Sequence, residues 1–161
     1  MKKQVLGALA MLSVVATLTV VGVVAPAGAS TFTQIMVDVP FAFSDGANRF
    51  PAGKYTIRPI GENGNAGISI TSEDGKAFGL RMCFNAEATS PRNDTALIFH
   101  RYGDMYFLSQ VWTVGDTIGL ELPRSSMERR LQRADQTSNG QSASSSGPAI
   151  VTIAATLPKA R

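Results

Sequence analysis

Apolar and polar residues alternate along most of the chain between Ile35 and Thr113. Apolar side chains at every second position are typical of a strand with one buried face. Together with the turn residues between the runs, the pattern predicts strands over residues 35–43, 54–60, 68–71, 76–84, 95–102, 105–113 and 120–122. Pro40 has no backbone donor, so we expect the first strand to lie at a sheet edge or to carry a bulge there.

Large apolar residues occupy every second position from Phe78 onward in the run from Lys76 to Phe84. Its large apolar side chains share one face, which we expect to point into the core: Phe78, Leu80, Met82 and Phe84. Cys83, the only cysteine, lies on the opposite face. A lone cysteine in an exported chain can be a dimer bridge or a reactive thiol, but it is more often a small buried hydrophobe. Burial of Cys83 therefore requires that the second face of this strand is also covered.

A two-residue turn at Gly103-Asp104 predicts a hairpin over residues 95–113. The turn fixes the register, which pairs Tyr102 with Met105, Arg101 with Tyr106, His100 with Phe107, Phe99 with Leu108, Ile98 with Ser109, Leu97 with Gln110, Ala96 with Val111, and Thr95 with Trp112. Both surfaces of the hairpin are then largely apolar. We expect a central hairpin buried on both sides, with an exposed aromatic patch used in binding as the alternative.

The pattern changes after Pro123. Ser125 and Glu128 form a capping box, and apolar residues at helical spacing predict a short helix over residues 126–135. Residues 136–148 are rich in Ser, Gly, Asn and Gln, which predicts a flexible linker. Residues 149–161 form an apolar C-terminal segment that could add a last strand.

These elements predict an all-β fold with one domain over residues 30–135. The expected architecture is an antiparallel β-sandwich or small barrel of about seven to eight strands with one short C-terminal helix. An outer-membrane barrel is disfavoured because the apolar segments are short and the chain ends in Lys159-Ala160-Arg161 rather than in an aromatic strand.

Residues 1–29 have the pattern of a secretory signal peptide. Lys2 and Lys3 precede an apolar run from Val5 to Ala25, and small residues follow up to the expected cleavage site after Ala29. The alternative is an uncleaved membrane anchor, since the run is just long enough to span a bilayer. Its small and polar residues favour cleavage, so we expect a periplasmic or extracellular protein that contacts a membrane only if the segment is retained.

Charge is divided unevenly along the exported part. Residues 30–123 hold seven basic and ten acidic residues, whereas residues 124–161 hold six basic and two acidic ones. The sequence pI of about 9.3 therefore gives no argument for nucleic-acid binding by the folded part. Four arginines near the predicted helix could meet an anionic surface, but a solvated helix face explains them more simply: Arg124, Arg129, Arg130 and Arg133.

The sequence offers little catalytic chemistry. A hydrolase triad can be drawn from the only histidine, His100, with Ser109 and Asp104. No nucleophile elbow or glycine-rich oxyanion loop surrounds Ser109, so a small hydrolase around His100 is the most distant alternative. One His and one Cys do not make a zinc site unaided, and the polar loops lack calcium-binding spacing. We therefore predict no catalytic residue, no metal site and no cofactor.

The hairpin holds the candidate binding residues Tyr106, Trp112, His100 and Tyr102. The leading hypothesis is a non-enzymatic exported β-sandwich that serves as a structural or interaction module of the periplasm or cell envelope. Its partner would be another protein or a second copy, bound through the apolar hairpin 95–113. The alternative is a carbohydrate- or ligand-binding module that uses exposed Tyr106 and Trp112 on one hairpin surface.

Several short runs also carry a resemblance. They are Val39-Pro40-Phe41-Ala42-Phe43, Pro51-Ala52-Gly53-Lys54-Tyr55, Phe99-His100-Arg101-Tyr102-Gly103-Asp104, Tyr106-Phe107-Leu108, Val111-Trp112, Leu122-Pro123-Arg124-Ser125 and Glu128-Arg129. Together they resemble an uncharacterised family of small exported bacterial proteins over roughly residues 32–133. The resemblance implies export and a single β-rich domain. It implies no catalytic or binding residue, because no activity is assigned to that family.

Overall fold

The computed structural model describes residues 34–61, 66–138 and 147–158. These residues form eleven strands in two sheets and one helix, which confirms the predicted all-β sandwich with a C-terminal helix. The first sheet contains β1 (Ile35–Val39), β4 (Gly53–Ile60), β5 (Gly67–Ser72) and β6 (Phe78–Met82), in the order β1-β4-β5-β6 with antiparallel neighbours.

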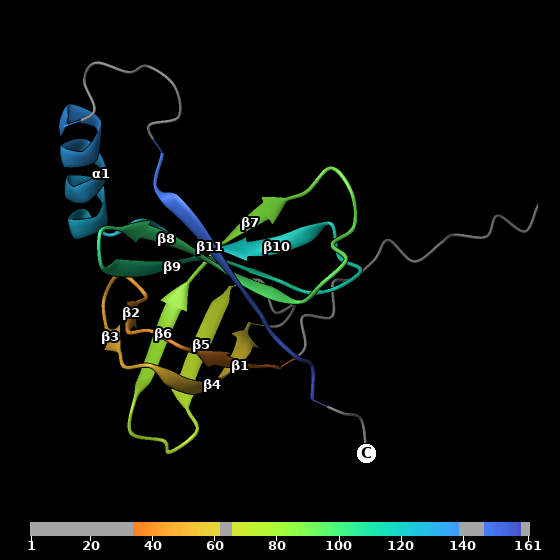
Figure 1. The fold of residues 1–161 in the computed structure, drawn as a ribbon. Helices are drawn as coiled ribbons and strands as arrows, with labels where there is room; N and C mark the ends of the chain where they lie inside the picture. Colours follow the sequence, from red (N-terminus) through yellow and green to blue (C-terminus); the bar gives the residue numbers. More distant parts are fainter. Residues whose placement is uncertain (1–33, 62–65, 139–146, 159–161) are drawn as a thin grey trace, which may run out of the picture.

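The second sheet has seven strands. It contains β2 (Phe43–Ser44), β3 (Arg49–Phe50), β7 (Phe84–Glu87), β8 (Ala96–Tyr102), β9 (Met105–Trp112), β10 (Ile118–Glu121) and β11 (Ala149–Ala154). Five of them follow the order β11-β8-β9-β10-β7, while β2 pairs with β9 and with β3. Figure 1 shows this sheet as a layer above the first sheet, with α1 (Ser126–Ser138) beside β8.

The strand predicted over residues 35–43 is divided at Pro40. The part before it, β1, is an edge strand of the first sheet, while the part after it, β2, pairs in parallel with β9 in the second sheet. Proline cannot donate to a strand ladder, so the chain leaves one sheet there and enters the other. This division, together with the short strands β3 and β7, accounts for the larger number of strands than expected.

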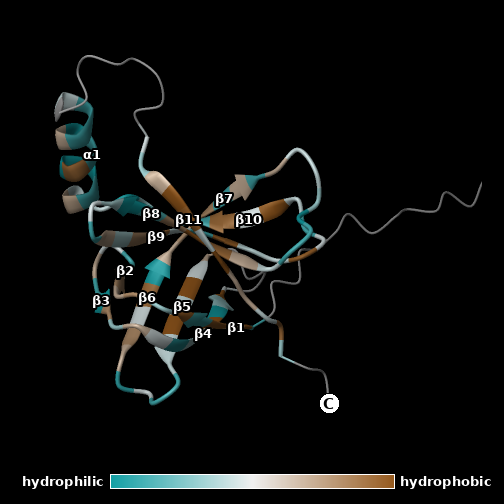
Figure 2. Cartoon of the chain, in the orientation of Figure 1, coloured by the Kyte–Doolittle hydropathy of each residue, from teal (hydrophilic) through white to brown (hydrophobic). Residues whose placement is uncertain are grey.

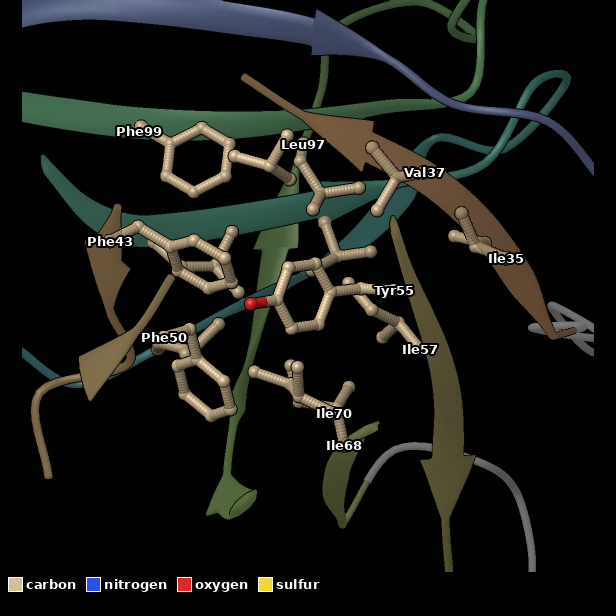
Figure 3. Packing of buried hydrophobic residues seen from close by; sticks show 14 of the residues in the cluster. Ile35, Val37, Phe43, Phe50, Tyr55, Ile57, Ile68, Ile70, Leu97 and Phe99 are labelled. Carbon is tan, nitrogen blue, oxygen red and sulfur yellow. The ribbon is translucent and has the colours of Figure 1, made fainter. Parts of the chain in front are cut away.

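The core lies between the two sheets. It consists of inward-facing apolar side chains from both layers, chiefly Ile35, Val37, Val39, Tyr55, Ile57, Ile68 and Ile70 from the first sheet and Phe43, Phe50, Leu97, Phe99, Leu108, Val111 and Leu120 from the second. Phe43 stacks on Phe50 with ring centroids 5.0 Å apart and meets the edge of Tyr55 at 5.2 Å. Figure 3 shows these three rings between Phe99 and Ile70.

The hairpin of β8 and β9 follows the predicted register only from its turn as far as the pair Phe99 and Leu108. Beyond that pair a bulge at Ser109 shifts the register, so that Ile98 pairs with Gln110 rather than with Ser109. The register predicted for the outer half of the hairpin is therefore wrong by one residue. A bulge inserts one unpaired residue, and it reverses the face of every side chain that follows in that strand.

The bulge serves the core. It brings Val111 opposite Leu97, and both side chains are fully buried between the sheets. It also sends Trp112 to the other face of the hairpin, away from Tyr106. The carbonyl of Ser109 accepts a hydrogen bond of 2.8 Å from the backbone N–H of Leu122, so the extra residue is satisfied.

Over the hairpin of β8 and β9, the face of the second sheet that points away from the core is also largely covered. At one end His100 contacts Glu128 of α1. At the other end Trp112 packs on Gly119, where a Cβ would lie only 2.6 Å from the ring, and the guanidinium of Arg92 lies 5.5 Å from the ring centroid. The prediction of a central hairpin buried on both sides is confirmed.

Helix α1 begins where the capping residues predict. Ser125 Oγ accepts a hydrogen bond of 3.1 Å from the backbone N–H of Glu128. The helix continues to Ser138, three residues past its predicted end, so the predicted linker starts too early. It is largely hydrophilic (Figure 2). Among the residues described, no helix has the length and apolar character needed to cross a membrane.

The C-terminal segment closes one side of the sandwich. β11 supplies the last strand that the sequence suggested, and it pairs antiparallel with β8 along its whole length. Beyond it, Thr156 exchanges two backbone hydrogen bonds of 2.8 Å with Met36 in β1, so the segment joins the second sheet to an edge of the first (Figure 1). The predicted signal peptide (1–29) and the main part of the predicted linker (139–146) lie outside the described residues, and both stay predictions.

Candidate interaction surface

Strand β6 presents its large apolar side chains to the outside. Phe78, Leu80 and Met82 are 57%, 54% and 66% exposed, and Phe84, the first residue of β7, is similarly exposed. The expectation that these four residues face the core is wrong. Alternation along the run is as predicted, but the face is inverted. We call Phe78, Leu80 and Met82 the β6 stripe.

The inverted face has a steric cause at Gly79. This residue points inward, and a Cβ built on it would lie 2.8 Å from Phe50 Cζ and 2.8 Å from Asp45 Oδ2. The turn between β2 and β3 occupies that space, because Asp45 is buried and accepts the backbone N–H groups of Ala47 and Asn48 at 2.7 and 2.6 Å. Only a residue without a side chain fits at position 79, so the phase that would turn the neighbouring bulky residues Phe78 and Leu80 inward is excluded.

Cys83 follows β6 on the same inward side as Gly79. It is buried and belongs to the core cluster, which confirms its expected role as a small buried hydrophobe. Burial raises the pKa of the Cys83 thiol to about 11, with the Arg81 charge opposing this shift in part. The thiol is therefore protonated at neutral pH and is a poor nucleophile.

The backbone of the β6 stripe also points to the free edge. The backbone N–H of Ser72 donates to the carbonyl of Ala77 at 2.9 Å, and the backbone N–H of Cys83 donates to the carbonyl of Ala66 at 3.3 Å. In an antiparallel ladder the hydrogen-bonded pairs alternate, so residues 77, 79, 81 and 83 bond to β5. The N–H and C=O groups of residues 78, 80 and 82 consequently face away from β5, and no strand pairs with them within the described residues.

The two edges of the first sheet differ in this respect. The β1 edge is covered by the bridge between Met36 and Thr156, whereas β6 has no such cover in the part of the chain that is described. The neighbouring positions on the outer face of β5 are polar, with Ser69 opposite Leu80 and Thr71 opposite Phe78. Natural edge strands are usually short, charged or interrupted by proline, so an uncovered apolar edge is a candidate site for the addition of another strand.

Of the predicted binding residues, Trp112 is only 4% exposed, and its Nε1–H donates to Gln110 Oε1 at 2.9 Å. Tyr106 lies on the opposite face of the hairpin and stacks on Phe41, with ring centroids 3.9 Å apart. The predicted platform of two exposed aromatic residues is therefore wrong. The bulge at Ser109 separates them, and the single sequence gives no sign of it.

His100 and Tyr102 lie on the face near α1. His100 Nδ1 is 2.8 Å from Glu128 Oε1, and both side chains are largely buried. Burial, followed by the Glu128 carboxylate, raises the pKa of Tyr102. Asp104 is fully exposed at the hairpin turn, 4.0 Å from Arg101, so it does not orient His100. The triad of His100, Ser109 and Asp104 is not assembled, and the partner of His100 is Glu128, which the sequence predicts only as a helix-capping residue.

Hollows of moderate size among the described residues lie away from β6, and two of them border residues named above. One, of about 230 Å³, is lined by the turn after β2, by Tyr106 and by Met127. The other, of about 440 Å³, lies at the seam of β1, β4 and the C-terminal segment, with Asp38, Lys54 and Glu73 at its wall. The described residues contain no group of three or more His, Cys, Asp or Glu side chains that could hold a metal ion.

No protein-family model, curated protein or solved structure matches the chain. The resemblance of residues 32–133 to a family of small exported proteins therefore stays a prediction.

Proposed function

We propose that the chain is a non-enzymatic interaction module of the periplasm or cell envelope, and that it binds its partner through the β6 stripe. The supporting observation is the combination of exposed apolar side chains with unpaired backbone groups on one edge strand. The hairpin 95–113 is a poorer candidate, because its exposed positions are Arg101, Gly103 and Asp104 only. A strand from a partner would pair with the β6 backbone, while the stripe would supply apolar contact.

The location follows from the expected signal peptide. Expression of the full chain in a bacterium, followed by fractionation and mass measurement, tests it. We expect the product in the periplasm or medium with a mass that lacks residues 1–29. A full-length product retained in the inner membrane would contradict export as a released protein.

Photocrosslinking in the expressing cell tests the surface. A benzophenone amino acid is placed at Leu80 or at Met82, and at Thr152 as the control. Thr152 is exposed on β11, which is also an edge strand but has a polar residue there. We expect discrete crosslinked products from positions 80 and 82 and none from position 152. No product at any position, or equal products at all three, would refute the proposal.

A further inference from the structure

We infer that the occupant of the β6 stripe is a second copy of this chain, paired antiparallel through β6 about a twofold axis at Leu80. This inference rests on the proposed function and names its partner. The pairing would join the two four-stranded sheets into one continuous sheet of eight strands. An interface of this kind is isologous, so the same strand must complement itself.

The register of β6 satisfies that condition. When Leu80 faces Leu80 of the second copy, Phe78 faces Met82, and Met82 faces Phe78. These three positions are the ones whose N–H and C=O groups face the free edge, so each pair can exchange two backbone hydrogen bonds, about six in all. In a register displaced by one residue, the free N–H and C=O groups of one copy would face backbone groups of the other copy that already bond to β5. The stripe of one copy would then also lie beside inward-facing side chains of the other.

The side chains match as well. Residues that face one another across an antiparallel pair lie on the same face of the sheet, so the two stripes form one apolar band. The band has a Leu–Leu contact at its centre and a Met–Phe contact on each side, and sulfur–aromatic contacts of this kind are favourable. None of the three positions holds a charged residue, so no like charges face each other within the band; Arg81, on the other face of β6, lies opposite Gly79 of the second copy.

The size of the interface sets the expected strength. With the exposed fractions given above and side-chain areas of about 200 Å², the stripe exposes on the order of 350 Å² in each copy, of which edge-to-edge pairing buries only the flanks of the side chains. Including the backbone and the flanking residues, the total buried area lies below the usual size of specific interfaces and at the level of weak, transient ones, under about 1,000 Å². We therefore expect a reversible dimer with a dissociation constant in the micromolar range rather than a permanent one.

Analytical ultracentrifugation of the purified exported protein, over concentrations from about 5 to 500 μM, tests the dimer. We expect a monomer–dimer equilibrium that L80K weakens by at least about 100-fold, because two like charges then face each other. The matched control is I150K, because Ile150 is 68% exposed on the other sheet. This control should leave the equilibrium unchanged. A wild-type monomer at every concentration would overturn the inference.

Charge exchange distinguishes a specific pairing from a loss of folding. L80K and L80E should each be monomeric, and their equimolar mixture should restore the dimer, because residue 80 faces residue 80. Far-UV circular dichroism verifies that both variants are folded. A mixture that stays monomeric while both variants are folded would overturn the twofold register.

A thiol crosslink tests the register independently. L80C should be joined to itself by a short bifunctional thiol reagent, because its two Cα atoms would be about 5.5 Å apart. F78C alone should not be joined, since its two copies lie roughly 13 Å apart along the strands, but a mixture of F78C and M82C should be. Efficient self-crosslinking of F78C with none for L80C would overturn the inference.

The photocrosslinking described above separates the two proposals. Products with the mass of two copies support self-pairing. Products that join β6 only to a different protein would leave the proposed function standing and overturn the second copy as its partner. The absence of any product from β6 would overturn both.

Discussion

The contact between His100 and Glu128 is expected to hold α1 against the second sheet. Glu128 is 4% exposed, and its Oε1 lies 2.8 Å from His100 Nδ1. It also lies 4.0 Å from Arg124 Nε, in a position more exposed to solvent. The pair is therefore the main polar link between the helix and β8.

The magnitude follows from what each substitution leaves behind. E128L removes the acceptor and leaves a buried imidazole without its hydrogen-bond partner, so we expect a loss of about 2 kcal/mol. H100L leaves a buried carboxylate, and the loss should be larger, about 3 kcal/mol. The double variant replaces both partners with apolar groups, so its loss should fall short of the sum by at least about 1.5 kcal/mol.

Urea unfolding measures these values, with Trp112 fluorescence reporting on the sheet and circular dichroism reporting on the helix. Trp112 is suited to this because it lies on the same face of the hairpin as His100. R129L serves as a surface control, since the Arg129 guanidinium bonds only to an exposed carbonyl of Arg124. Losses that add within about 0.5 kcal/mol would show that the pair does not couple, and would refute the reasoning.

Three further predictions concern single residues. Cys83 should react with a thiol reagent only after denaturation. Its pKa is raised from 9.0 to about 11 in the folded protein, so the unfolded chain loses the thiol proton first as the pH rises. The free energy of unfolding should therefore fall between these pH values in wild type and change less in C83A, and identical pH curves for the two proteins would contradict this. G79A should destabilise the protein by about 1–3 kcal/mol in thermal or urea unfolding, because its Cβ would enter the space of buried Phe50. The control G147A should leave stability unchanged, because the space around Gly147 is open. Equal effects of the two substitutions would refute the steric argument. G119A should displace the Trp112 ring, because the added Cβ would overlap it. We expect Trp112 fluorescence that is blue-shifted and resistant to acrylamide quenching in wild type, and red-shifted and more readily quenched in the variant. An unchanged spectrum would show that the ring position does not depend on this glycine.

The sequence predicts which side chains of a strand share a face, but it does not always predict which of the two faces points into the core. Alternation over residues 76–84 identifies two sets of side chains and does not say which set is inside. Size alone would put Phe78 and Leu80 in the core. The choice is made by the contact between Gly79 and Phe50, which lie far apart in the sequence, and a steric conflict of that kind is invisible to a local pattern.

The hairpin shows a second limit. Its turn fixes the register near Gly103, and the first pairs are as predicted. A bulge then changes the register at Ser109, whose carbonyl bonds to Leu122 in a later segment. Because side chains alternate, one extra residue was enough to separate Tyr106 from Trp112 and to remove the predicted aromatic platform.

The helix gives an intermediate case. Ser125 and Glu128 predicted its start correctly, since a cap is a local interaction. The carboxylate of Glu128 was expected to return to the helix end, as in a capping box. It lies instead against His100, 28 residues earlier in the chain. A short motif can thus indicate an element correctly while the tertiary structure gives one of its side chains a different partner.

The bond between Thr156 and Met36 spans 120 residues, nearly the whole described chain. During synthesis, β11 emerges after all the other strands described, and until then the edges of β1 and β8 both lack their neighbour. A premature stop before Ala149 would leave these two edges open in addition to β6. Such a shortened product would expose the edges of β1 and β8 in addition to the edges that are already free, and we expect aggregation and proteolysis to remove it.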